Sequence, residues 1–289
     1  MTQTKQRDGS IPGSKLLLLG GTGTGKTHAI RSWIKAGVTP FCIFTEPSHE
    51  VLGDIPADKL HWHYIPAMKV SFGDMLDSAK KINQSTYEML AKMPSINKEK
   101  YTEMIDVLTT CNAYRCDRTG ESFGAVDSWN TDRVLVLDSL SGLSIMAMNL
   151  VVGSKPVKAQ GEWGVAMDNL ERFIYKLTTD LQCHFMLTAH AEREIDEVAG
   201  GTNVTVSTLG RKLAPKLPRF FSDVVLAKRD GADFTWSTAA TGVDLKTRNL
   251  KIANGITPSA EQIIDTWKSR GGVILPTTPV VAAVPSAGR

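Results

Sequence analysis

Short apolar runs alternate with longer amphipathic stretches along this chain, and most runs stop at a polar residue or a glycine turn. Such runs are typical of buried strands in a parallel sheet, whereas apolar residues spaced three and four apart are typical of helices. We therefore expect an α/β fold with a mostly parallel central sheet flanked by helices. The expected strands are 16–19, 41–45, 60–65, 134–138 and 183–188.

Helical spacing predicts the elements between these strands. It runs from 73 to about 112 with a break at 93–97, and it returns at 170–181. A capping-box pattern at 259–262 opens a last short helix. The Asp-Gly pair at 230–231 lies between two strand-like pieces and predicts a β-hairpin near the C-terminus.

The chain divides into three parts on this pattern. Residues 1–13 are polar and contain Gly and Pro, which indicates a flexible lead. A single domain is expected over 14–270, with a helical and loop insertion at about 73–128. Residues 271–289 are expected to be a disordered tail.

The turn after the first strand carries the clearest chemical signal. Its sequence, GGTGTGKT, matches the P-loop pattern without a mismatch. Glycines let backbone N–H groups approach phosphates closely. Lys26 is expected between the β- and γ-phosphates, and the Thr27 hydroxyl is expected on Mg²⁺. The sequence thus predicts ATP and Mg²⁺ as cofactors, with the nucleotide bound by Gly20, Gly21, Thr22, Gly23, Thr24, Gly25, Lys26 and Thr27.

Polar side chains follow three other expected strands, at Glu46, Asp138 and His190. Ligands of open α/β sheets bind at the carboxyl ends of the strands. Asp138 ends a buried run in the Walker B arrangement and is expected to hold Mg²⁺, although such an aspartate can also cap a turn. His190 would reach the γ-phosphate if its strand neighbours that of Asp138, and a purely structural role is the alternative. With Lys26, these three are the catalytic candidates.

A polar, glycine-containing stretch at 191–212 indicates a long functional loop. Basic residues gather at its far side, where they can either contact DNA phosphates or form a solvated helix face. These candidates are Arg211, Lys212, Lys216 and Arg219. Because the loop has little aromatic content, contacts to the DNA backbone are expected rather than base stacking.

Composition adds three limits. The chain has 289 residues, 42% of them hydrophobic, which suffices for a sizeable core, and its net charge of +3 does not by itself indicate nucleic acid. It shows no apolar signal region and no membrane-length apolar run, so a cytoplasmic protein is expected. Four cysteines indicate reduced thiols. Cys111 and Cys116 are read either as loop cysteines or as part of a zinc site.

The P-loop, the strand ends at Glu46, Asp138 and His190, and the terminal hairpin come in an order that resembles the RecA-like ATPase core. Within that class, the chain resembles the phage-encoded RecA-like proteins that act as single-strand annealing recombinases, over about 14–270. The resemblance implies that Glu46 orients or activates water and that His190 replaces the usual Gln or Asn sensor. It also implies that Lys246 and Arg248 reach a neighbouring subunit's nucleotide in a ring or filament.

The function expected from this resemblance is Mg²⁺-dependent ATP hydrolysis coupled to single-stranded DNA binding and annealing, in the cytoplasm of a bacterial host. A homo-oligomer and a single-strand-binding protein are the implied partners. Two alternatives stay open: a protein-directed ATPase, such as a helicase loader or a KaiC-like switch, and a small-molecule kinase. DNA-stimulated hydrolysis would separate the recombinase from the protein-directed ATPase, whereas a kinase would need an acceptor pocket and an arginine-rich lid.

Overall fold

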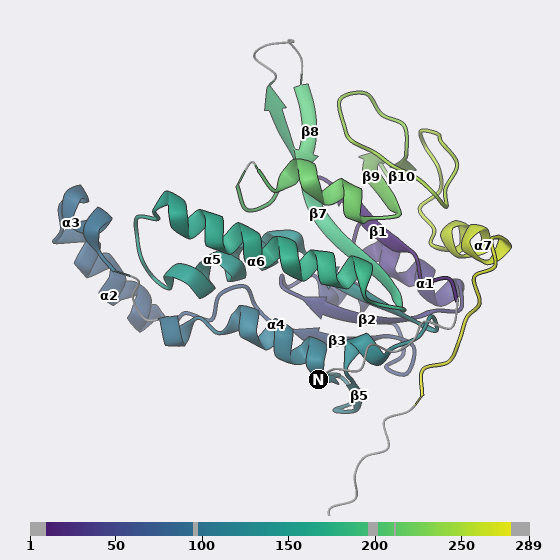
Figure 1. Ribbon diagram of the computed structural model, residues 1–289, viewed down its shortest axis with the longest axis horizontal. Coiled ribbons are helices and arrows are strands. Elements are labelled where there is room, and N and C mark those ends of the chain that lie inside the picture. Colours follow the sequence, from purple (N-terminus) through teal and green to yellow (C-terminus); the bar gives the residue numbers. More distant parts are fainter. Residues whose placement is uncertain (1–9, 95–97, 196–201, 211, 279–289) are drawn as a thin grey trace, which may run out of the picture.

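The structure is a computed structural model that describes residues 10–94, 98–195, 202–210 and 212–278. It contains one large sheet between two layers of helices, and a small separate hairpin (Figure 1). The strands are β1 (Lys15–Gly20), β2 (Thr39–Phe44), β3 (His61–Tyr64), β4 (Tyr114–Arg115), β5 (Ser122–Gly124), β6 (Arg133–Asp138), β7 (His184–Ile195), β8 (Thr202–Val206), β9 (Asp223–Asp230) and β10 (Asp233–Ser237). The α-helices are α1 (Arg31–Lys35), α2 (Phe72–Asn83), α3 (Tyr87–Lys92), α4 (Glu103–Asn112), α5 (Leu140–Val152), α6 (Gln160–Thr179) and α7 (Glu261–Ser269). The 3-10 turns are η1 (His28–Ile30), η2 (His49–Leu52), η3 (Lys98–Lys100), η4 (Val126–Ser128) and η5 (Ala214–Phe220).

The large sheet has the strand order β10-β9-β1-β7-β6-β2-β3, and β8 pairs with the far end of β7. Neighbouring strands from β9 to β3 are parallel, whereas β10 and β8 run antiparallel to their partners. This confirms the predicted α/β fold with its mostly parallel sheet and C-terminal hairpin. Since β7 lies beside β6, the condition for placing His190 near Asp138 is met.

Burial on both faces explains why the strands read as continuous apolar runs. Leu17 and Leu19 of β1 share one core cluster with buried residues of α4, α5 and α6. Leu16 and Leu18 share the other cluster with α1 and α7. Successive side chains of a strand point to opposite faces, so each layer of helices receives every second residue.

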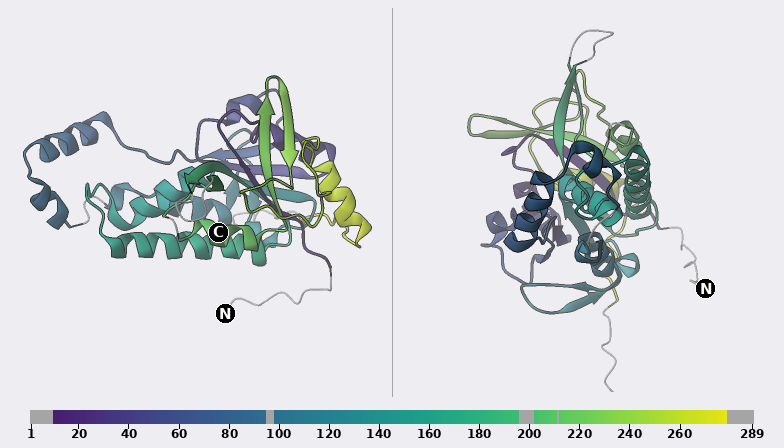
Figure 2. Two further views of the ribbon diagram at one scale, coloured as in Figure 1. Left: turned by 90° about the horizontal axis from the view of Figure 1, so that it is seen from above. Right: turned by 90° about the vertical axis from the view of Figure 1, so that its left-hand side faces the viewer.

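The helices of the insertion differ in how far they join the core. The predicted helical stretch from 73 to 112 forms α2, α3 and α4, because Thr86 caps a new helix after α2 by accepting a hydrogen bond from the backbone N–H of Met89. In α2 and α3, which the structure describes in full, no side chain is buried. Both project beyond the ends of α5 and α6 (Figure 2).

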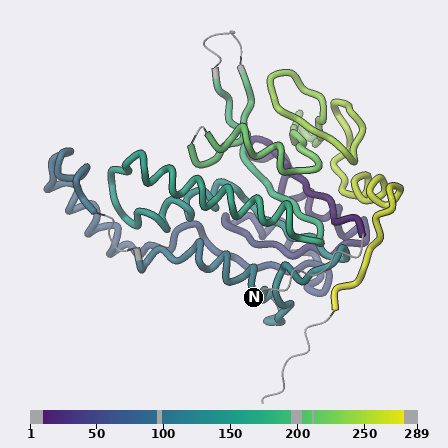
Figure 3. The backbone as a smooth tube through the Cα atoms, in the orientation of Figure 1, coloured from purple at the N-terminus to yellow at the C-terminus, as the bar shows by residue number. Residues whose placement is uncertain are grey.

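The predicted long loop at 191–212 is partly wrong. β7 continues past His190 to Ile195 and pairs with β8, with Ala191 opposite Val206. The tube in Figure 3 shows β7 running from the core of the domain into the hairpin that it forms with β8. In 191–195 and 202–206, strand pairing therefore supplies partners for backbone groups that a loop would leave to solvent. Residues 196–201 and 211 lie outside the described residues.

The predicted flexible ends also need correction. The Thr131 hydroxyl donates to the carbonyl of Val273 over 2.7 Å, and Thr277 is buried against Asp132. At the other end, the indole of Trp267 donates to the Pro12 carbonyl over 2.9 Å. Polar partners thus attach residues 12–13 and 273–277 to the domain, and the outermost residues lie outside the described ranges. Within those ranges, no helix is both long and apolar enough to cross a bilayer.

Candidate nucleotide-binding site

The turn between β1 and η1 adopts a shape that its glycines permit. Gly23 and Gly25 have φ angles of 74° and 79°, in the left-handed region that other residues disfavour. A Cβ atom at Gly20 would lie 2.5 Å from the Thr24 hydroxyl oxygen, so a side chain there would displace the turn. Consecutive N–H groups in such a turn form a concave site for anions. The backbone therefore suits phosphate binding.

Lys26 lies at the base of this turn. Its ammonium donates to the carbonyls of Gly20 and Gly21 over 2.9 and 2.8 Å, and the residue is 8% exposed. Burial lowers the pKa of Lys26, and the carboxylates of Asp138 and Glu46 oppose that lowering. The two carboxylates therefore help to keep a buried cation charged where phosphates would bind.

Asp138, at the carboxyl end of β6, faces the P-loop across β7. Its Oδ2 accepts from the hydroxyls of Thr27 and Ser48 over 2.6 and 3.2 Å, and its Oδ1 accepts from Thr188 over 2.5 Å. The residue is 3% exposed. A hydroxyl beside a carboxylate fits Mg²⁺, which takes oxygen ligands. Thr27 and Asp138 would hold the ion, which when bound neutralises charge on the phosphate oxygens.

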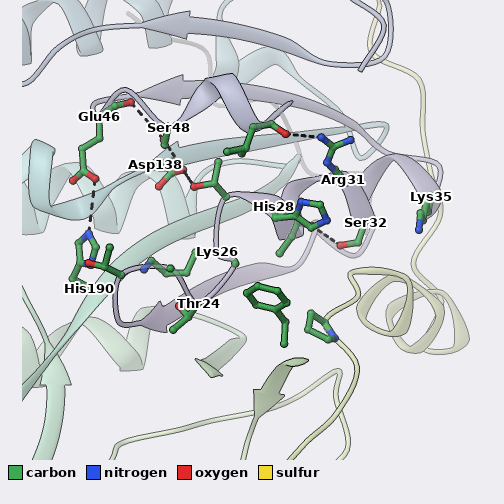
Figure 4. Close-up of a pocket in the computed structure, with 18 residues that line it drawn as sticks. Thr24, Lys26, His28, Arg31, Ser32, Lys35, Glu46, Ser48, Asp138 and His190 are labelled. Carbon is green, nitrogen blue, oxygen red and sulfur yellow. Dashed lines mark hydrogen bonds and ion pairs between the residues drawn. The ribbon is translucent and has the colours of Figure 1, made fainter. Parts of the chain in front are cut away.

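Glu46 and His190 complete the polar edge of the sheet. Figure 4 shows their side chains pointing toward one another from β7 and from the loop after β2, with Glu46 Oε2 3.8 Å from His190 Nε2. The hydroxyl of Ser139 donates to Glu46 Oε1 over 2.5 Å. Ser139 is itself fixed, since its backbone N–H donates to the Thr45 hydroxyl. The Ser139 hydroxyl thus holds the Glu46 carboxylate, and His190 lies near its other oxygen.

Glu46, Asp138 and His190 line one cavity of about 640 Å³ together with residues 22–27 of the P-loop turn. β10 and the loop before α7 also line the cavity, through Phe234 and Pro258. Sequence reasoning gave these two residues no role. The available signal was Phe234 itself, an aromatic residue close to the polar turn of the predicted hairpin.

The predicted DNA-binding residues are not all free to contact phosphates. Lys216 and Arg219 both pair with Glu171 of α6, over 2.7 and 3.4 Å. Lys212 is exposed, and Arg211 lies outside the described residues. Because one carboxylate faces two of these cations, the basic surface of η5 is partly neutralised.

The predicted trans-acting residues lie at the other edge of the sheet from the P-loop. Lys246 pairs with Val224 near the start of β9, and the Arg248 N–H donates to Asp223 Oδ1 over 2.9 Å. Asp223 is in register with Leu16, at the beginning of β1, whereas the P-loop follows the end of β1. Neither residue therefore belongs to the cavity of its own chain.

The two cysteines that suggested zinc show no metal site. Burial raises the pKa of the Cys111 thiol to about 12, whereas a metal ligand must be a thiolate. Within the described ranges, no group of three or more His, Cys, Asp or Glu residues could hold a metal ion. Cys111 lies in α4 and Cys116 directly follows β4, and their interpretation as ordinary thiols stays a prediction.

The parallel sheet, the P-loop after β1 and the carboxylate at the end of β6 define a P-loop fold of the α/β class, with a cavity at the P-loop. The family described as AAA domain matches residues 13–254, and the chain belongs to that family. No curated protein matches it. Among solved structures it is similar to the RadB recombinase, at 10% identity over 85% of this chain and 86% of that one, with a TM-score of 0.39. It is also similar to the flagellar accessory protein FlaH from Methanocaldococcus jannaschii, at 10% identity, 79% and 78% coverage and a TM-score of 0.32.

Proposed function

We propose that the protein is a Mg²⁺-dependent ATPase that binds single-stranded DNA and promotes annealing of complementary strands. The observation that carries the ATPase assignment is the meeting of five side chains around one cavity at the carboxyl edge of the sheet. They are Lys26, Thr27, Glu46, Asp138 and His190. A P-loop with a lysine binds phosphates in many proteins, but a second, fixed carboxylate is needed mainly where water attacks.

Each of these residues has a distinct task in the proposal. Lys26 binds the phosphates and compensates their charge as it shifts during transfer. Glu46, held by Ser139, orients or activates the attacking water, because its other oxygen remains directed toward His190 and the cavity. His190 reports the state of the terminal phosphate. Since phosphoryl transfer depends mostly on positioning and charge, this small set suffices.

The proposed link to DNA runs through β7. His190 faces the nucleotide cavity, and Ala191 next to it already belongs to the hairpin with β8. Loss of the terminal phosphate would thus move His190, and through β7 it would move the β7–β8 hairpin, because no loop separates the two. Contacts to the DNA backbone, with Lys212 among the candidates, would provide the affinity.

We also propose a homo-oligomer, in which Lys246 and Arg248 reach the nucleotide of a neighbouring copy. Both lie at the amino edge of the sheet, away from the cavity of their own chain. They would contribute to hydrolysis only if that edge met the cavity of another copy. Trans-acting cations raise turnover by about 10³-fold or more in other P-loop enzymes, so an isolated subunit is expected to be slow.

A protein-directed ATPase is the second candidate, and the charges around the hairpin favour it. Lys216 and Arg219 already share Glu171, and β7 carries Glu192 and Glu194 beside Arg193. A mixed-charge hairpin is a poorer match for a phosphate backbone than a basic one. This candidate keeps the same hydrolytic site and replaces DNA by a protein on the hairpin.

Steady-state ATP hydrolysis with and without single-stranded DNA, at low and moderate salt, tests the proposal. Wild type is expected to show Mg²⁺-dependent hydrolysis that DNA stimulates and that salt weakens. Lys26→Ala should lose hydrolysis and nucleotide binding, whereas Glu46→Gln should lose hydrolysis but still bind ATP. Hydrolysis without stimulation or DNA retention would favour a protein partner, and absence of Mg²⁺-dependent hydrolysis would refute the ATPase itself.

A further inference from the structure

The β9–β10 hairpin extends past the end of β1 and forms one side of the nucleotide cavity. Ala227 of β9 is in register with Gly20, the last residue of β1, but β9 continues to Asp230 before the chain turns. The contact with the P-loop is close, since a Cβ atom at Gly20 would lie 2.8 Å from the Ala227 carbonyl oxygen. The turn end of the hairpin therefore lies beside the P-loop, past the last β1–β9 pair.

Phe234 is the aromatic residue of this overhang. It pairs with Arg229, beyond the last β1–β9 pair, and it is 43% exposed. Its side chain lies on the same face of β10 as that of Trp236, which is buried in the core shared with α1 and α7. A Cβ atom at Gly25 would lie 2.9 Å from its ring carbon Cδ1. The ring thus continues the apolar layer past the sheet edge and into the cavity.

Phe234 and three of the catalytic candidates lie on opposite sides of β1. Glu46 follows β2, Asp138 ends β6 and His190 lies within β7, all on one side of β1, whereas β9 and β10 lie on its other side. A nucleotide on the P-loop with its terminal phosphate toward Glu46 has its sugar and base directed away from these strands. The cavity wall on that side contains Phe234 and Pro258.

We propose that Phe234 is the platform on which the base of the bound nucleotide stacks. The inference rests on the proposed nucleotide binding and adds a recognition residue to it. The ring is held in place, because the Arg229 guanidinium lies 5.3 Å from its centroid and is itself anchored by the carbonyl of Gly231. Every base has a π-face, so the platform favours a nucleoside triphosphate over inorganic triphosphate without selecting adenine.

Calorimetric titration with ATP, GTP and inorganic tripolyphosphate, in the presence of Mg²⁺, tests this role. Loss of one base–aromatic stack weakens binding by about 5- to 150-fold, so Phe234→Ala should raise the Kd for ATP and GTP by a factor in that range. The Kd for tripolyphosphate should stay at the wild-type value. Phe234→Tyr, which keeps a π-face, should restore nucleotide affinity.

Tyr87→Ala is the matched control, because Tyr87 is an aromatic residue that is 72% exposed on α3 and does not line the cavity. It should bind all three ligands as wild type does, and thermal melting should show that each variant is folded. An unchanged Kd for ATP in Phe234→Ala, or an equal loss for ATP and tripolyphosphate, would overturn the stacking role. ATP binding with this pattern but without hydrolysis would refute the ATPase proposal and leave the platform standing.

Discussion

Two buried aspartates lie at opposite strand ends of the same sheet, one at the carboxyl ends and one at the amino ends of the strands, and their surroundings differ. Asp138, at the carboxyl end of β6, is 3% exposed and accepts hydrogen bonds from three side-chain hydroxyls, of Thr27, Ser48 and Thr188. Asp223, at the amino end of β9, is 0% exposed. Its donors are the hydroxyls of Ser14 and Thr247, the backbone N–H groups of Arg248 and Asn249, and the side-chain amide of Asn249.

The two aspartates differ in whether their hydrogen-bond donors could move away and leave the carboxylate free to bind a cation. Asp138 lines the cavity, and rotation of the Thr27 hydroxyl would release one of its oxygens to a cation. Asp223 is tied to backbone groups, which can move only if the loop at 247–250 moves. A buried carboxylate at a strand end is thus a candidate for chemistry where its donors are mobile and a cavity adjoins it. Where backbone groups enclose it, the carboxylate serves stability.

The same substitution at both positions should separate these roles, with the largest effect expected at Asp138. Asp138→Asn removes the charge proposed to hold Mg²⁺ and should lower kcat for ATP by about 10²–10³-fold, the usual cost of one electrostatic group at a transition state. Its melting temperature should stay close to that of wild type, since an amide oxygen still accepts from hydroxyls. A variant that keeps its turnover would assign Asp138 a structural role like that of Asp223.

Asp223→Asn should show the reverse pattern. The new amide group must face at least one of the present donors, so the variant is expected to lose about 1–3 kcal/mol of stability. Urea denaturation of both variants measures this loss. The kcat of folded Asp223→Asn should equal that of wild type at a temperature where both are folded. Loss of activity without loss of stability would contradict the comparison.

The sequence predicted the carboxyl edge far better than the amino edge, for a physical reason. Phosphate binding needs a local pattern, so the run ending in Lys26 and Thr27 is readable from neighbouring residues alone. Asp223, by contrast, bonds to residues far away in the chain, from Ser14 to Asn249. No local pattern marks such a network, since its donors meet only when the sheet has formed.

Two other features escaped prediction for related reasons. The stretch after His190 is polar and contains glycines, so it was expected to be a loop, yet strand pairing with β8 gives it regular structure. Phe234 shows the opposite problem, because its hairpin was predicted and its contact with the P-loop was not. Tertiary packing sets which strand lies beside β1, and the strand order brings the β9–β10 hairpin next to the P-loop.

His184, at the amino end of β7, is expected to make the stability of the protein depend on pH. Burial, with a smaller contribution from the charge of Lys15, lowers the pKa of His184 to about 3, and its Nδ1 accepts from the backbone N–H of Ser14 over 2.9 Å. In the unfolded chain a histidine has a pKa of about 6.5. Between these values unfolding takes up a proton, so the free energy of unfolding falls as the pH drops below about 6.5.

By pH 5 this linkage should cost about 2 kcal/mol, from about 1.4 kcal/mol per pH unit. His184→Asn keeps an acceptor near the Ser14 N–H and has no proton to bind, so its stability should fall less steeply over the same range. Urea midpoints from pH 7.5 to 5 measure the two slopes, and the absolute stabilities do not matter to the comparison. Equal slopes for the two proteins would show that His184 is not the group responsible.

The smallest effect is expected one residue beyond Asp138. Ser139 is buried and donates to Glu46 Oε1 over 2.5 Å, so Ser139→Ala should free the carboxylate to rotate without removing it. Loss of a charge-assisted hydrogen bond is worth about 1.5 kcal/mol, and kcat should fall about tenfold.

Because Ser139 is expected to touch neither phosphates nor base, the KM for ATP should stay unchanged, and Ser139→Thr, which restores a hydroxyl, should recover most of the turnover. A purely structural Ser139 would instead lower the melting temperature and leave kcat unchanged. That result would mean that the carboxyl edge positions Glu46 through the backbone alone, as the amino edge fixes Asp223.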